Sequence, residues 1–164
     1  MTESKVVSIS NLAEIVRDLK NRKKAVVHCH GCFDLMHPGH IKYFQSAKKM
    51  GDILIVTVTP DKFVDKGPGR PVFNEKLRAE SIAALECVDY VAVNEWPTAE
   101  DTLRLLRPDI YVKGQEFEKL KDKTGKIQKE ADVVKEIGAK LAFTHEVVFS
   151  STKLIEQMFR EGKK

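Results

Sequence analysis

The chain has 164 residues, of which 42% are hydrophobic and 32% are charged, with a formal net charge of +4. This length is typical of one domain, which buries about two thirds of the surface exposed by its unfolded chain. No apolar run approaches the roughly 20 residues of a membrane span, and the N-terminus lacks a secretion signal. No basic stripe interleaved with aromatic residues predicts nucleic-acid binding. We therefore expect a cytoplasmic, soluble protein whose ligands are small anions.

Strand-like and helical patterns alternate along the chain. The first helix is expected over 11–21, where Asn11 and Glu14 are placed like a capping box. Such alternation predicts a doubly wound, Rossmann-like α/β domain with a parallel sheet, at 25–164, after an N-terminal helical extension at 1–24. The expected strands are 25–30, 53–59, 88–93, 109–113 and 140–144, and the expected helices between and after them are 40–50, 74–86, 99–107, 129–138 and 151–160.

The most informative segment joins the first expected strand to the next helix, and residues 31–40 read GCFDLMHPGH. Pro38 suits the first helical position, and Gly39 lets a ligand approach the backbone. The amides of a first helical turn attract anions, and His37 and His40 lie near one face of that turn. We predict that both histidines are catalytic, because imidazoles placed there can donate hydrogen bonds to phosphate in a transition state. In the alternative interpretation, one histidine caps the helix, the other packs beneath it, and the glycines only form a turn.

This pattern, Gly-x-Phe-Asp-x-x-His-x-Gly-His, resembles the signature of the cytidylyltransferase-like nucleotidyltransferase superfamily. The resemblance implies that the two histidines bind the triphosphate of an incoming nucleotide. Within the motif, the predicted nucleotide contacts are Gly31, Cys32, Phe33, Asp34 and Gly39.

A C-x-x-C pattern formed by Cys29 and Cys32, with His28 and His30 interleaved, invites a metal or redox interpretation. No second cysteine pair completes a zinc site, and Cys87 lies far along the chain. We expect Cys29 to be a small buried strand residue and Cys32 to be a compact loop residue beside the nucleotide. No metal ligand among the side chains is predicted.

Two irregular segments, 60–73 and 114–128, follow strand ends, where ligands bind in doubly wound sheets. The first segment carries Lys62, Lys66 and Arg70 on a glycine-rich stretch, which favours anion binding over a purely solvated loop.

The last expected helix begins with Ser150, Ser151, Thr152 and Lys153. Capping explains one of these hydroxyls. Three hydroxyls and a lysine at a helix start predict a second anion site.

A closer resemblance, from about residue 11 to 160, is to the heptose-phosphate adenylyltransferase domain of bifunctional ADP-heptose synthases and its stand-alone versions. The residues that carry it are Gly51-Asp52, 66–71, Arg78, 87–91, 112–114 and Ser151-Thr152. The resemblance implies that Ser151 and Thr152 hold phosphate and that Lys66 lies in a flexible basic loop. It also implies that Arg78 and Lys113 contact nucleotide or sugar phosphate. With these, the predicted contacts to the nucleotide include Lys66, Lys113, Gly114, Ser150, Ser151 and Thr152, and those to the acceptor are Asp61, Arg70 and Arg78.

Glycerol-phosphate cytidylyltransferases share the fold and the two-histidine loop but carry an Arg-Thr-Glu-Gly-Ile-Ser-Thr-Thr run before the last helix. Residues 145–152 read HEVVFSST here and lack that arginine, although His145 could partly replace its charge. The difference favours ATP over CTP. The segment 117–126 is longer than in ordinary heptose adenylyltransferases and follows 112–114, where the family recognises its base, so its role stays open.

The expected reaction is attack of a sugar phosphate, heptose 1-phosphate in the first instance, on the α-phosphorus of ATP, with release of pyrophosphate. Mg²⁺ is expected to arrive with the nucleotide, because the chain has no dense acidic cluster. A homodimer and a sugar kinase are the expected partners. The alternatives are a cytidylyltransferase that uses CTP on glycerol 3-phosphate or another small phosphate or phosphonate, a non-catalytic nucleotide-binding module, and a metal or redox protein built on Cys29 and Cys32.

Overall fold

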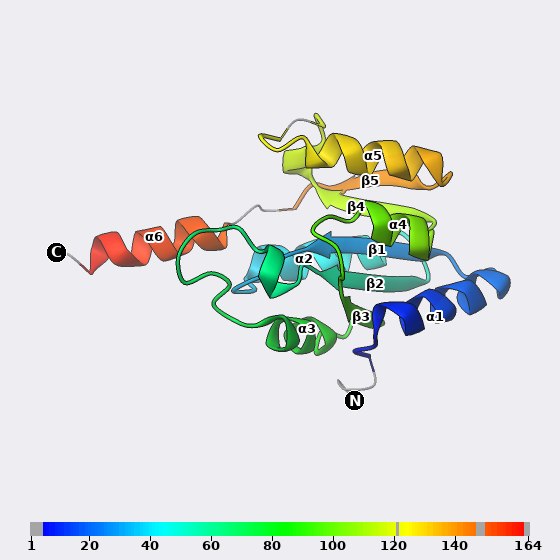
Figure 1. Ribbon diagram of the computed structural model, residues 1–164, viewed down its shortest axis with the longest axis horizontal. Helices are drawn as coiled ribbons and strands as arrows, with labels where there is room; N and C mark the ends of the chain where they lie inside the picture. Colours follow the sequence, from blue (N-terminus) through cyan, green and yellow to red (C-terminus); the bar gives the residue numbers. More distant parts are fainter. Residues whose placement is uncertain (1–4, 121, 147–149, 163–164) are drawn as a thin grey trace.

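The computed structural model describes residues 5–120, 122–146 and 150–162. Its strands form one parallel sheet in the order β3-β2-β1-β4-β5, which confirms the predicted doubly wound α/β class (Figure 1). The strands are β1 (Val26–Gly31), β2 (Ile53–Val58), β3 (Tyr90–Val93), β4 (Ile110–Gly114) and β5 (Lys140–Thr144). The helices are α1 (Ile9–Asn21), α2 (Pro38–Lys48), α3 (Glu75–Ala83), α4 (Glu100–Leu106), α5 (Lys126–Glu136) and α6 (Ser151–Glu161), with short 3-10 turns η2 (Asp61–Phe63) and η3 (Gln115–Phe117).

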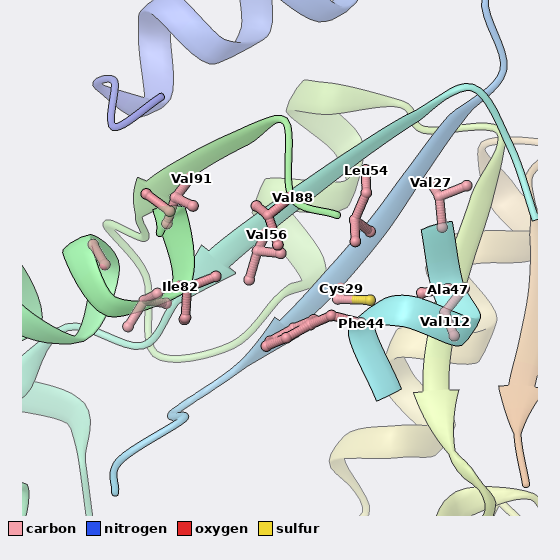
Figure 2. Packing of buried hydrophobic residues seen from close by; sticks show 13 residues of the cluster. Val27, Cys29, Phe44, Ala47, Leu54, Val56, Ile82, Val88, Val91 and Val112 are labelled. Carbon is pink, nitrogen blue, oxygen red and sulfur yellow. The ribbon is translucent and has the colours of Figure 1, made fainter. Parts of the chain in front are cut away.

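Helices cover both faces of the sheet. On one face, α2 packs against β1 and β2, and α3 packs against β2 and β3, while α1, α4 and α5 lie on the other face. The core of the first face joins Cys29 and Val56 of the sheet to Phe44 and Ala47 of α2 and to Ile82 of α3 (Figure 2). The central strands β1 and β2 are almost fully buried, as expected for strands between two helical layers.

The register of the strands aligns their carboxyl ends at one edge of the sheet. Gly31 pairs with Val58, which pairs with Val93, and Gly114 pairs with Thr144. The loops that follow these strands therefore meet at one edge, as the Rossmann-like prediction requires.

The N-terminal helix begins earlier than predicted. Ser8 is its N-cap, and the Ser8 hydroxyl accepts a hydrogen bond from the backbone N–H of Asn11 at 3.2 Å, so the predicted capping box on Asn11 and Glu14 is wrong. The reason is that Ile9 is buried and belongs to the helix. The buried side chains of α1 share a core cluster with β1, β2, β3 and α4, so the predicted boundary after residue 24, which stays a prediction, falls within one continuous core.

The last helix, α6, projects away from the body of the domain (Figure 1). Of its residues only Ser151 is buried, whereas Leu154, Met158 and Phe159 are exposed. Within the part of the chain that the structure describes, no helix is long and apolar enough to cross a membrane.

Candidate active site

His37 and His40 form a reciprocal cap at the start of α2. His37 is the N-cap, Pro38 takes the first helical position as predicted, and the two imidazole rings stack with centroids 3.8 Å apart. Each backbone N–H of the pair donates to the Nδ1 atom of the other ring at 3.4 Å. Because Nδ1 accepts a hydrogen bond, the proton of each neutral ring lies on Nε2. The contacts that cap the helix thus use Nδ1 of each ring and place the N–H group on Nε2.

The surroundings of both imidazoles disfavour the protonated, charged form. The pKa of His40 is lowered to about 4, mainly by burial, and His37 and Lys66 contribute to the lowering. Burial also lowers the pKa of His37. A backbone hydrogen bond acts in the opposite direction, and the charge of Lys66 adds to the lowering. Neutral Nε2–H groups are suited to stabilise an anion, because they need no reorganisation when charge develops.

The turn between β1 and α2 is strained. Phe33 and Leu35 have φ angles of 51° and 52°, a left-handed conformation that costs a non-glycine residue about 1–2 kcal/mol. Packing holds Phe33 in place, because its ring contacts the rings of Phe44 and His40 with centroid distances of 4.9 and 5.5 Å. A Cβ atom on Gly31 would lie 2.9 Å from the Phe33 ring, so glycine is needed there.

A cavity of about 210 Å³, here called the first cavity, opens above the carboxyl ends of β1, β4 and β5. It brings together many of the residues predicted to contact the nucleotide. They are Gly31, Cys32, Phe33, His37, Gly39, His40, Lys66, Lys113 and Gly114.

A second cavity, of about 250 Å³, adjoins the first. The two share Lys66, Lys113 and Phe117, together with His30 and Cys32. Its other lining residues include polar side chains of the segment whose role the sequence left open, as well as residues after β2 and β3. They are Asp122 and Lys126 of that segment, Thr59 and Asp65 after β2, and Thr98 after β3, and Glu130 of α5 also lines this cavity.

Lys113 lies between the two cavities at the end of β4. Its Nζ is 4.7 Å from the centre of the Phe117 ring and 3.8 Å from Oε2 of Glu130. Glu130 is buried and also accepts a hydrogen bond from the Tyr111 hydroxyl at 2.9 Å. The lysine is therefore held by a carboxylate and an aromatic face in a position to meet phosphate from either side.

Asp34 does not line either cavity but anchors the glycine-rich loop. Its carboxylate accepts hydrogen bonds from the backbone of Val72 at 2.7 Å and Phe73 at 3.1 Å, and pairs with Arg70 at 2.9 Å. Burial raises the pKa of this carboxyl, but these donors outweigh burial and bring the pKa below its usual value. Arg70 in turn donates to the Thr152 hydroxyl at 3.1 Å.

Arg78 and Asp61 form an ion pair of 2.6 Å in which the guanidinium is buried. Arg78 also donates to the carbonyl groups of Phe73 at 2.9 Å and Cys32 at 2.7 Å. Arg78 thus joins the motif loop to the residues before α3 and to Asp61, and the roles of Arg78 and Asp61 toward a substrate stay predictions.

The hydroxyls at the start of α6 hold that helix against the motif loop. Ser150 is the N-cap and accepts from the N–H of Lys153, and Ser151 donates to the carbonyl groups of Asp34 at 2.7 Å and Leu35 at 3.1 Å. Neither Ser150, Ser151 nor Thr152 lines the two cavities described. Their predicted contact with phosphate is untested, and residues 147–149 of the preceding run lie outside the described residues.

The C-x-x-C cysteines occupy the predicted places. Cys29 is fully buried in β1, and burial raises the pKa of its thiol to about 12, which disfavours the thiolate needed for metal or redox chemistry. Cys32 lies in the loop and lines both cavities. Within 5–120, 122–146 and 150–162, no group of three or more His, Cys, Asp or Glu side chains could hold a metal ion.

Sequence reasoning missed several residues of the first cavity. Tyr43 lies one helical turn after His40, Thr144 ends β5, Glu146 follows it, and His30 is the residue before the motif. The places of Thr144 and His30 at strand ends could have indicated them. Gln115 also lines this cavity, and its side chain donates to the carbonyl of Glu146 at 2.8 Å, which joins two segments of the cavity lining.

The chain is similar in sequence to several proteins named "Bifunctional protein HldE". The chain is 41% identical over 117 residues to the protein of Syntrophotalea carbinolica, and this match covers 70% of the chain and 24% of the relative. It is 35% identical over 165 residues to the protein of Geobacter metallireducens, and this match covers 97% of the chain and 32% of the relative. The chain thus spans about a quarter to a third of the length of these relatives.

Two solved structures are also similar. A lipopolysaccharide core biosynthesis protein from Thermoplasma volcanium GSS1 matches with a TM-score of 0.60 and 27% identity, over 76% of this chain and 99% of that one. A pantoate-beta-alanine ligase from Francisella tularensis matches with a TM-score of 0.65 over 92% of this chain and 72% of that one. At 14% identity the second likeness shows the fold alone.

A family model described as cytidylyltransferase-like matches residues 28–157, which include the two stacked histidines, both cavities' shared residues and the start of α6. This match confirms the resemblance drawn from the motif at 31–40. The chain belongs to the cytidylyltransferase-like family of nucleotidyltransferases.

Proposed function

We propose that the protein transfers AMP from ATP to a sugar phosphate, D-glycero-D-manno-heptose 1-phosphate in the first instance, and releases pyrophosphate. The observation that carries the proposal is the pair of Nε2–H imidazoles of His37 and His40 in one cavity with Lys66 and Lys113. Neutral donors and two lysines in a cavity at the strand ends suit a triphosphate that must be held while charge moves onto pyrophosphate.

In the proposed reaction, an oxygen of the acceptor phosphate attacks the α-phosphorus of ATP. The bond between the α-phosphorus and its bridging oxygen to the β-phosphate breaks, and that oxygen leaves with the pyrophosphate. Because the acceptor phosphate is already ionised, no protein nucleophile or strong general base is needed. His37 and His40 would stabilise the charge that collects on the departing phosphates.

We assign the nucleotide to the first cavity and the acceptor to the second. Lys66 and Lys113 lie where the cavities meet, so they could contact the α-phosphate and the acceptor phosphate together. In the second cavity, Lys126 supplies a further cation and Glu130 supplies a buried acceptor for sugar hydroxyls. The additional length of the segment 117–126 would then serve the acceptor.

We expect Mg²⁺ to be bound by the nucleotide phosphates. The oxygens of Asp34 are engaged by Arg70 and two backbone amides, and Asp61 is paired with Arg78, so these carboxylates are better placed to support loops than to hold a metal. When bound, Mg²⁺ would neutralise charge on the phosphates.

A matrix of nucleotides and acceptors tests the proposal. ATP, CTP, GTP and UTP are each combined with heptose 1-phosphate, glycerol 3-phosphate or no acceptor, and pyrophosphate release is measured with Mg²⁺ present. We expect release that depends on both ATP and heptose 1-phosphate. Release with CTP and glycerol 3-phosphate would favour the cytidylyltransferase alternative, and nucleotide binding without release in any combination would favour the non-catalytic module.

The homodimer and the sugar-kinase partner stay predictions. Sedimentation velocity of the purified chain tests the first, and co-purification with a sugar kinase from the source cell tests the second. The relatives are named bifunctional and are about three to four times longer than the segment that matches this chain. Their names and lengths are compatible with a second activity, either on the same polypeptide or on a separate partner protein.

A further inference from the structure

Three buried polar residues lie directly beneath the junction of the two cavities. His28 and His30 are on β1, and Thr57 is their neighbour on β2, where it pairs in register with His30. The Thr57 hydroxyl oxygen is 2.7 Å from Nε2 of His28 and 2.8 Å from Nδ1 of His30. His28 and Thr57 are fully buried, whereas His30 is 7% exposed and lines both cavities.

The proton positions in this group follow from its contacts. Nδ1 of His28 is buried and has no hydrogen-bond partner among the described residues. A proton there would leave an N–H group buried without an acceptor, which proteins rarely tolerate, so the proton of the neutral ring belongs on Nε2. Nε2–H of His28 then donates to Thr57, and the Thr57 hydroxyl donates its own proton to Nδ1 of His30. This leaves the proton of His30 on Nε2.

We infer that His28 and Thr57 hold His30 as an Nε2–H donor to a phosphate oxygen where the two cavities meet. The identity of that phosphate, on the nucleotide or on the acceptor, rests on the proposed function. Phosphate oxygens only accept hydrogen bonds, so the opposite tautomer would point a lone pair at them. In this assignment His30 contacts the substrate, and His28 and Thr57 are positioning residues.

The surroundings keep His30 neutral. Burial lowers its pKa well below the usual value, and Lys113, His28 and Lys126 contribute to the lowering, whereas a backbone hydrogen bond with Thr57 acts in the opposite direction. Burial lowers the pKa of His28 to about 3, with Lys113 adding to the effect. His30 would therefore resemble His37 and His40, and would add a third neutral donor where the two cavities meet.

Nitrogen NMR tests the tautomers without any assay of activity. Long-range ¹H–¹⁵N correlation spectra of the uniformly ¹⁵N-labelled full chain at pH 7 distinguish Nε2–H from Nδ1–H rings, and a His30→Gln variant assigns the signal. We expect both His28 and His30 as Nε2–H tautomers. An Nδ1–H tautomer or a doubly protonated ring for His30 would overturn the inference.

Addition of a non-hydrolysable ATP analogue with MgCl₂, followed by heptose 1-phosphate, tests the contact. We expect the His30 Nε2–H signal to shift on one of these additions. Shifts confined to His37 and His40 would overturn the role of His30 while leaving the proposed function in place. If none of the five histidines responded, the nucleotide site itself would be contradicted, whereas the tautomers would still be known.

Thr57→Val and Thr57→Ser separate positioning from packing. Thr57→Val keeps the shape but removes the hydroxyl, so we expect a loss of about tenfold in kcat/KM, the size of one hydrogen bond to a charged group. Thr57→Ser keeps the hydroxyl and should remain within about threefold of the parent chain. Equal losses in both variants, at equal loss of melting temperature, would mean that Thr57 only packs. In a His30→Gln background, the further effect of Thr57→Val should disappear.

Discussion

At the scale of single residues, the cap on α2 is unusual in its chemistry. Serine, threonine, aspartate or asparagine caps a helix with a smaller side chain, yet the chain uses two histidines whose Nδ1 atoms accept from the backbone. The capping contacts thus use Nδ1, and the proposed contacts with phosphate use Nε2 of the same rings. The interpretation in which one histidine only caps accounts for the contacts of Nδ1, but not for two stacked Nε2–H groups at a cavity with Lys66.

His37→Asn separates these two roles. Asparagine is a good N-cap, so the melting temperature should stay within a few degrees of the parent chain. Loss of the Nε2–H donor should lower kcat by about a hundredfold or more, as for other preorganised donors to transition-state charge. Steady-state pyrophosphate release and a thermal melt measure both effects.

Ser8→Asn is the matched control for this variant, because Ser8 is the exposed N-cap of α1 and lies outside both cavities. It should leave kcat close to that of the parent chain. A His37→Asn variant that folds and keeps the parent rate would remove His37 from the catalytic residues.

At the scale of elements, periodicity and turn chemistry in the sequence were enough to predict five strands, six helices and the place of the motif between β1 and α2. The ends of the elements were less accurate, since a cap such as Ser8 depends on whether the next residue is buried. Lys66 could be placed near the site because it lies in the loop after β2 and parallel strands end at one edge, whereas Lys113 was placed there by the family resemblance.

Partners across irregular segments could not be predicted. Asp34 and Arg70 are far apart in sequence, and their pairing depends on how the loop after η2 folds back over the motif. The contact of Thr57 with His28 and His30 depends on the register of β1 and β2, which the apolar pattern of fully buried strands leaves unspecified.

The start of α6 carries a second prediction, in which Ser151→Ala and Thr152→Val are combined. If these hydroxyls also contact phosphate, ATP affinity should fall by about tenfold at a temperature where the variant is fully folded. Loss of the contacts to Asp34, Leu35 and Arg70 should separately lower the melting temperature by a few degrees. Calorimetric titration with ATP and a thermal melt measure the two effects.

Ser81→Ala is the control, because it removes an exposed hydroxyl from α3 away from both cavities. It should change neither ATP affinity nor, beyond a few degrees, the melting temperature. Unchanged ATP affinity in the double variant, beside a lowered melting temperature, would leave docking of α6 as the only role of the two hydroxyls.

At the scale of the whole molecule, the buried imidazoles make stability depend on pH. The folded-state pKa values of His28 and His40, about 3 and about 4, lie below the usual value of 6.5. As the pH falls below 6.5, the unfolded chain takes up protons that the folded chain does not, so the free energy of unfolding decreases. His28 alone contributes a slope that approaches about 1.4 kcal/mol per pH unit.

Urea unfolding at pH 7, 6 and 5 measures this dependence. We expect the midpoint to fall steadily toward pH 5, before the lowered pKa of the Asp34 carboxyl adds a further loss at lower pH. A midpoint that is constant or rises between pH 7 and pH 5 would contradict the neutral, buried state of these histidines.

The most direct test of the central claim compares ATP with CTP on heptose 1-phosphate. The ratio of the two kcat/KM values reports how differently the site binds the two transition states. If the first cavity frames adenine between Gly114 and Phe117, ATP should be preferred by at least about tenfold, which corresponds to about 1.4 kcal/mol. A kcat/KM for CTP equal to or above that for ATP would contradict the adenylyltransferase assignment and favour a cytidylyltransferase.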